Sequence, residues 1–260
     1  MHARNALATL AIALVGTATA MPDHSADIAL GQKVLADLSA KHQIVTDSPY
    51  EAALRRVGAR IALAAGPTWF TERFFVVRGN AINAFSVPGG YVFVDEGLLR
   101  SVDDADELAA VLGHETAHLV LGHVDEKLRE QSRRKAAGRA GHILGSVGSY
   151  FGYGQIETAA NLSTSVAGYA FLNYTRQQEY AADQLGAAIA AKAGFNPWGS
   201  VWFQEEVEVL VGPGGFEQYV QHHPSVKDRI DRLRAYITSN PALFGRWHDL
   251  RPSATGLPEQ

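Results

Sequence analysis

The sequence contains no cysteine among its 260 residues. This absence excludes a disulfide scaffold, a thiolate nucleophile and any zinc or iron–sulfur site held by cysteine. A metal site would therefore use histidine and carboxylate side chains, and the chain contains 10 histidines. An excess of basic residues is also lacking, since 23 Lys and Arg face 27 Asp and Glu. A dedicated nucleic-acid binder is normally basic, so we expect no nucleic-acid partner.

The apolar run near the N-terminus, at 6–16, is too short for a transmembrane helix. It has eleven residues, whereas a helix that spans a bilayer needs ~20. The run follows Arg4 and precedes Ala18-Thr19-Ala20. A positive region, a short apolar core and a small-x-small cleavage pattern are typical of a secretory signal peptide. We predict a cleaved signal peptide over 1–20 and a periplasmic mature protein, with a retained anchor as the alternative.

The hydrophobic pattern changes its period along the chain. Residues 73–94 contain three short runs of aromatic and β-branched residues, and these predict a small antiparallel sheet. Apolar residues at helical spacing predict helices on both sides of that block, over 27–42, 50–65, 103–122, 174–193, 197–211 and 225–238. Helices, a small sheet and further helices favour the α+β class. We expect one mainly helical domain over 21–250 and a C-terminal tail over 251–260.

Residues 127–172 do not fit this regular pattern. A basic stretch over 127–139 leads into a glycine-rich apolar stretch. An amphipathic helix followed by a mobile loop over a cleft is one interpretation. Peripheral contact with an anionic membrane surface is the other, because basic residues beside apolar ones suit that contact.

The most informative stretch of the sequence is 108–121, which is apolar except at His114, Glu115, Thr116 and His118. Apolar residues all round a helix predict that it is buried. Unpartnered histidines and a carboxylate are costly to bury. A helix turns about 100° per residue, so His114 and His118 lie one turn apart on one face and can reach one metal ion. This is the H-E-x-x-H zinc helix, with Glu115 as the general base; two satisfied core histidines are the alternative.

A hydrolytic zinc site keeps three protein ligands and an open position for water. The best third candidate is Glu179, in the stretch Glu-Tyr-Ala-Ala-Asp that ends at Asp183. Both carboxylates lie on one face of the expected helix over 174–193. We predict that Glu179 binds the ion and that Asp183 holds a ligand imidazole through its second ring nitrogen. A solvated helix face is the alternative.

H-E-x-x-H followed by E-x-x-A-D resembles the gluzincin metallopeptidases, and more specifically the HtpX, BepA and Oma-type family, which includes the CAAX prenyl proteases. Further segments share the resemblance, which runs from about residue 28 to 235: Asn83-Ala84-Phe85, Pro88-Gly89-Gly90-Tyr91-Val92, Gly97-Leu98-Leu99, His223-Pro224 and Arg229. The resemblance implies a zincin-like fold and one Zn²⁺ per chain, bound by His114, His118 and Glu179, with Glu115 as catalytic base.

The same resemblance implies roles for three residues outside the two motifs. His223 and Arg229 would lie over the site and stabilise charge on the substrate, and Asn83 would bind substrate near the scissile bond. For His223 the alternative is a surface histidine, with His222 as a rival for the role. For Asn83 it is a turn or strand-edge residue.

These observations predict a zinc-dependent endopeptidase that cleaves unfolded or misassembled proteins in the cell envelope. The substrate would lie extended along an edge strand near 90–94. One alternative is a latent, chaperone-like periplasmic binding protein in which His223 takes the open position of zinc. Others are a non-catalytic metal-binding fold and, less well supported, an enzyme of the cell wall. The sequence shows neither the multi-span membrane region of HtpX and the prenyl proteases nor the helical-repeat tail of BepA, so a membrane-embedded or prenyl-substrate role is not expected.

Overall fold

The computed structural model describes residues 24–41, 43–137, 174–210, 223, 226–253 and 256–257. The helices of these ranges are α1 (Ser25–Ala40), α2 (Glu51–Ala65), α3 (Glu96–Ser101), α4 (Ala105–Val120), α5 (His123–Ala137), α7 (Arg176–Lys192), α8 (Gly199–Leu210), α10 (Val226–Ser239) and α11 (Pro241–Phe244). The strands are β1 (Ile44–Val45), β2 (Arg73–Val77), β3 (Ala84–Val87) and β4 (Tyr91–Asp95). The predicted α+β class is confirmed, and each predicted helix is present within a few residues of its expected bounds.

Two predictions fall largely outside these ranges. The expected signal peptide over 1–20 lies outside the described residues, and so does 138–172 of the expected membrane-contact segment. Within the described ranges, no helix combines the length and the apolar content needed to cross a bilayer.

The four strands form one mixed sheet in the order β1-β2-β4-β3. β3 and β4 pair antiparallel across a tight turn, in which Gly89 and Gly90 have φ of +85° and +86°. β2 pairs with β4 in parallel, so the prediction of a purely antiparallel sheet was wrong for this pair. The physical reason that β4 has β2 as a second neighbour is burial: Tyr91 and Phe93 face one apolar cluster and Val92 and Val94 face another, and a strand buried on both faces takes a central place.

This strand order also corrects the expected position of an extended substrate. β4 hydrogen-bonds to β2 on one side and to β3 on the other, so the stretch near 90–94 is not an edge strand. Among the described strands that lie beside the site, the edge belongs to β3.

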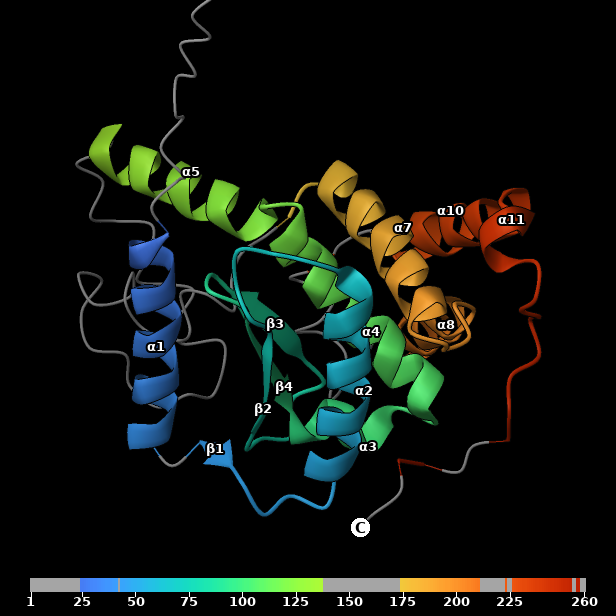
Figure 1. Cartoon of the computed structure of the whole chain (residues 1–260), viewed down its shortest axis with the longest axis horizontal. Coiled ribbons are helices and arrows are strands. Elements are labelled where there is room, and N and C mark those ends of the chain that lie inside the picture. The colour runs from blue at the N-terminus through green and yellow to red at the C-terminus, as the bar shows by residue number, and fades with distance from the viewer. Residues whose placement is uncertain are drawn as a thin grey trace, which may run out of the picture.

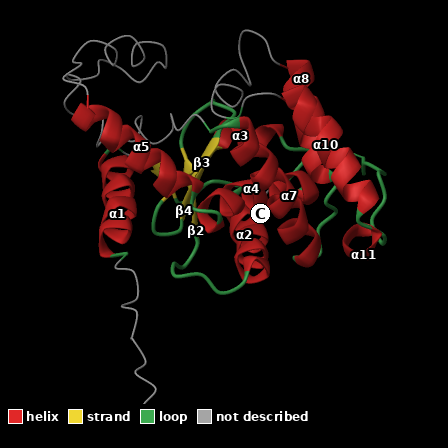
Figure 2. Ribbon diagram, turned by 90° about the horizontal axis from the view of Figure 1, so that it is seen from above, coloured by secondary structure: helices red, strands yellow, loops and turns green. Residues whose placement is uncertain are grey.

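Helices cover both faces of the sheet. α1 packs on one face, where Val34 and Leu38 join a cluster with Phe85 and Phe93. The larger core lies on the other face and is built by α2, α4, α7, α8 and α10. Figures 1 and 2 show the resulting order, with the sheet between α1 and the main helical layer.

The central element of that layer is α4. It begins at the N-cap Asp104, whose side chain accepts hydrogen bonds from the backbone N–H groups of Asp106 and Glu107. Every residue from Glu107 to Leu119 is buried, as the apolar pattern all round the helix predicted. α4 packs most extensively against α7, and this contact brings the two sequence motifs together.

Two glycines allow α4 and α7 to approach closely. A Cβ atom placed on Gly186 of α7 would lie 2.8 Å from the backbone nitrogen of His114, and one on Gly113 of α4 would lie 2.8 Å from the carbonyl oxygen of Gly186. Both distances are shorter than van der Waals contact. The crossing therefore requires glycine at both positions, and it lies one residue from the first motif histidine.

Two of the described C-terminal residues contact the domain, while 252, 253 and 256 are exposed. Arg251 pairs with Glu107 at the start of α4 and also with Glu206 of α8. Leu257 is 5 % exposed and belongs to the main core. Arg251 and Leu257 of the expected tail over 251–260 therefore hold it against the domain.

Candidate active site

The two motif histidines lie on one face of α4, as the helical spacing predicts. His114 Nε2 and His118 Nε2 are 3.0 Å apart. Both rings are buried. Burial lowers the pKa of His118 well below its usual range, so this imidazole is neutral and keeps a lone pair for a cation.

The first turn of α7 brings Glu179 to the same point. This helix begins at the N-cap Thr175, which forms a capping box with Gln178, and Glu179 follows directly in the first turn. Glu179 Oε1 lies 3.5 Å from His118 Nε2, and Oε2 lies 3.6 Å from His114 Nε2. The structure thus brings together the three residues expected to bind the metal, although His114 and Glu179 are 65 positions apart in the sequence.

His223 lies among these ligand atoms. Its Nδ1 is 3.1 Å from each carboxylate oxygen of Glu179 and 3.2 Å from His114 Nε2. One ligand atom from each of the four residues, His114, His118, Glu179 and His223, lies within 4.8 Å of the others. We expected His223 over the site and facing substrate, but in this structure it completes the group of potential ligands.

The four donors fit a divalent cation. Donor atoms around a tetrahedral zinc, each about 2.0–2.1 Å from the ion, lie about 3.3 Å apart. Five of the six pairs of residues here have donor atoms 3.0–3.6 Å apart, and the atoms of every pair lie within 4.8 Å. Burial raises the pKa of Glu179, but His223 and Arg229 outweigh it and hold that pKa well below its usual range. Glu179 is therefore ionised. Neutral imidazole and ionised carboxylate are the forms that bind zinc, although this ligand set also accepts cobalt or manganese.

Glu115 lies beside this group and is buried. Its Oε2 accepts a hydrogen bond of 2.9 Å from the Ser86 hydroxyl of β3, and its Oε1 lies 3.5 Å from His223 Nε2. Burial raises the pKa of Glu115, although His223, His114 and Ser86 oppose the shift. A carboxyl group with a raised pKa near a metal site is suited to accepting and returning a proton.

Asp183 and Arg229 support the site from behind. Asp183 Oδ1 lies 3.1 Å from His114 Nδ1, which is the second-nitrogen contact that the sequence predicted. Arg229 donates to both Asp183 oxygens, at 2.8 and 2.7 Å, and its Nη1 lies 2.8 Å from Glu179 Oε2. Arg229 has no exposed surface. Its position differs from the expected contact with substrate, because the guanidinium compensates the charge of two buried carboxylates.

Asn83 is not brought into the ligand group. It precedes β3 and is buried, and its side chain hydrogen-bonds with Asp95. Its carbonyl oxygen accepts from the Asp95 backbone N–H. A role in substrate binding for Asn83 stays a prediction.

Sequence reasoning missed two aromatic neighbours of His118. His123 Nδ1 lies 3.1 Å from His118 Nδ1, which places it to orient this ring. The Tyr174 ring stacks on His118 at a centroid distance of 3.8 Å. His123 could have been found, because it follows His118 by five residues where the helix ends. Tyr174 gave no comparable sign.

The sequence pattern of Peptidase family M48 matches residues 49–237, which include the whole ligand group. A putative beta-barrel assembly-enhancing protease of Vibrio cholerae is 31 % identical over 224 residues, which cover 84 % of this chain and 45 % of that protein. The mitochondrial metalloendopeptidase OMA1 of Schizosaccharomyces pombe is 31 % identical over 184 residues, 70 % of this chain and 51 % of that protein. The chain thus spans about half the length of these relatives. The family match confirms the resemblance seen in the two motifs: this chain belongs to peptidase family M48.

Proposed function

We propose that this protein is a zinc-dependent endopeptidase whose ligands are His114, His118 and Glu179. The observation that supports this most directly is the convergence of the three side chains beside a buried glutamate. A zinc ion in this place would act as a Lewis acid on the scissile carbonyl and make water nucleophilic near neutral pH. Glu115 takes a proton from the attacking water and passes it to the leaving amine.

The substrate in this proposal is an extended segment of an unfolded or misassembled envelope protein. An extended chain can add its backbone to a sheet edge without strong dependence on sequence, and β3, which carries Ser86 next to Glu115, is that edge. The word "assembly" in the name of the Vibrio cholerae relative supports this class of substrate. The expected signal peptide supports action in the periplasm.

The test compares purified wild-type protein with Glu115→Gln, using zinc analysis and cleavage of casein. We expect one zinc ion in both proteins. Loss of the general base should slow cleavage at least 10²-fold, while the ligand set is unchanged. Cleavage by Glu115→Gln at the wild-type rate would contradict the assignment. Absence of zinc from both would contradict the proposed cofactor.

A second candidate is a latent protein that grips unfolded chains without efficient cleavage. Two observations favour it. His223 Nδ1 already lies among the potential ligands, where it can take the position that water needs. His114, Glu115, His118, Glu179 and His223 are each at most 5 % exposed, so a substrate could reach them only after the site opens.

His223→Ala separates the two candidates. If His223 blocks the open position, this substitution should raise casein cleavage above the wild-type level. If His223 stabilises charge on the substrate, the same substitution should lower cleavage, typically by about 10²-fold or more. Zinc content, measured in both proteins, controls for loss of the ion.

A further inference from the structure

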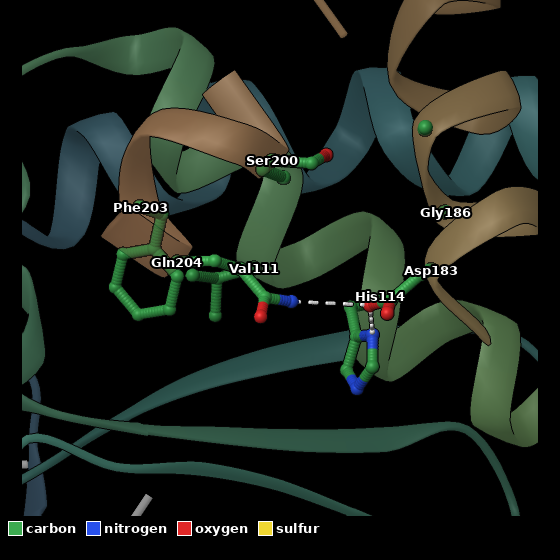
Figure 3. Close-up of a pocket in the computed structure, with 9 residues that line it drawn as sticks. Val111, His114, Asp183, Gly186, Ser200, Phe203 and Gln204 are labelled. Carbon is green, nitrogen blue, oxygen red and sulfur yellow. Dashed lines mark hydrogen bonds and ion pairs between the residues drawn. The ribbon is translucent and has the colours of Figure 1, made fainter. Parts of the chain in front are cut away.

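A buried glutamine of α8 contacts Asp183, the carboxylate that lies beside the ligand His114. Gln204 is 3 % exposed, and its Nε2 donates to Asp183 Oδ1 at 3.3 Å. The same oxygen lies 3.1 Å from His114 Nδ1. Figure 3 shows both contacts, which meet at the Asp183 carboxylate, one from Gln204 and one from His114.

Nothing in the packing of α8 requires an amide at this position. Val201 and Val207, three residues before and after Gln204, are fully buried. The Gln204 carbonyl oxygen is buried and has no hydrogen-bond partner in the described part of the chain. A buried carbonyl without a partner lowers stability. The favourable contribution of this side chain therefore comes from the hydrogen bond that its N–H group donates to Asp183 Oδ1.

The packing beside Asp183 leaves room for a small shift of its carboxylate. A cavity of about 10 Å³ lies beside it, lined by Val111, Gly186 and Gln204 among others, and a space of that size holds at most one water molecule. Close packing alone therefore does not fix the carboxylate. Arg229 donates to it from one side, and Gln204 donates from α8.

We propose that Gln204 is a positioning residue of the metal site. It holds the Asp183 carboxylate in the orientation that places Oδ1 3.1 Å from His114 Nδ1, and that contact directs His114 Nε2 toward the other ligands. An imidazole ligand depends on its second nitrogen for its orientation and tautomer. The inference rests on the metal site of the proposed function.

The experiment replaces Gln204 with methionine, which has a similar volume and no N–H donor. Zinc affinity is measured by competition with a chromophoric chelator, and the visible spectrum of the Co²⁺-substituted protein reports ligand geometry. Loss of a partner that contacts a ligand directly costs about 10- to 100-fold in metal affinity. Gln204 acts one contact further away, so we expect about 3- to 10-fold weaker zinc binding and a changed Co²⁺ spectrum.

Glu205→Gln is the matched control. Glu205 is the next residue of the same helix and pairs with Arg234. The zinc affinity of the Glu205→Gln protein should therefore stay within about twofold of wild type. The melting temperature of each metal-free protein reports packing separately. Gln204→Leu is a second variant without a donor, used if Gln204→Met does not fold.

The outcomes are distinct. Weaker zinc binding with an unchanged melting temperature of the metal-free protein supports the proposal. Zinc affinity equal to wild type in a folded Gln204 variant overturns it, whether or not the melting temperature falls. Absence of zinc binding by the wild-type protein would overturn both this inference and the proposed function, whereas equal affinities would overturn this inference alone.

Discussion

Gly186→Ala should damage both the fold and the metal site, because it adds one methyl group where α4 and α7 cross. The new Cβ would lie 2.8 Å from the backbone nitrogen of His114, 2.9 Å from the carbonyl carbon of Gly113 and 3.0 Å from the His114 Cα. Nonbonded carbon atoms are at their best at about 3.5–4.0 Å. All three neighbours are backbone atoms that cannot rotate away, so the helices must separate by about 0.5–1 Å.

The expected loss of stability follows from two opposing effects. Overpacking in a core costs about 1–3 kcal/mol, and contact with rigid backbone favours the upper end. Alanine is a better helix former than glycine by about 1 kcal/mol, which offsets part of that cost. The net loss is about 2 kcal/mol, equivalent to about 4–8 °C in melting temperature for a domain of this size.

The same separation moves the ligands. Glu179 and Asp183 lie on α7, and His114 lies on α4, so a shift of about 0.5–1 Å exceeds the tolerance of about 0.5 Å for a functional site. We expect zinc affinity to fall at least about tenfold. Thermal melting of the metal-free protein and chelator competition measure the two effects separately.

Gln184→Ala, on the exposed side of α7, is the control, and it should change stability by less than about 0.5 kcal/mol. The reasoning would be refuted if Gly186→Ala had the melting temperature and the zinc affinity of the wild-type protein. Such a result would mean that the glycine crossing does not set the distance between the two ligand-bearing helices.

Three further predictions concern charge and capping. Burial raises the pKa of Asp95 to about 7. Because the folded state holds this proton more tightly, the contribution of Asp95 to wild-type stability falls as pH rises from about 4 through 7. The free energy of unfolding of Asp95→Asn should therefore rise relative to that of wild type between pH 5 and 8, and the difference should approach about 4 kcal/mol. Urea unfolding of the metal-free proteins measures it. Arg229→Met leaves Asp183 and Glu179 buried without their cation, so the free energy of unfolding should fall by about 3–5 kcal/mol; a purely substrate-binding role predicts no such loss. Thr175→Ala removes the capping box of α7 and should cost about 1 kcal/mol in the same urea assay.

The parts of the site that the sequence predicted are those set by local geometry. His114, Glu115 and His118 lie within one helical turn, so their relative positions follow from the helix itself. Glu179 and Asp183 are related in the same way within α7. That the two turns face each other rested on the resemblance and on the chemistry of the donors, since no local pattern places one helix against another.

The remaining features depend on packing between distant segments. Arg229 comes 46 positions after Asp183, and His223 comes 109 positions after His114. The periodicity of a sequence does not predict which buried groups such distant residues contact. The sheet order is a partial exception. The stretch YVFVD is apolar at four successive positions, which is a pattern of a strand buried on both faces, and this could have placed β4 in the centre.

Charge balance gives an independent reason to expect a divalent cation in this site. Glu115, Glu179 and Asp183 are all buried, and Arg229 is the one guanidinium that the structure places among them in its described part. Three ionised carboxylates against one guanidinium leave two negative charges in a region where uncompensated charge is costly. The raised pKa values of Glu115 and His223 show how protons compensate this charge. One divalent cation would neutralise it without those protons, and so would leave Glu115 ionised and able to act as a base.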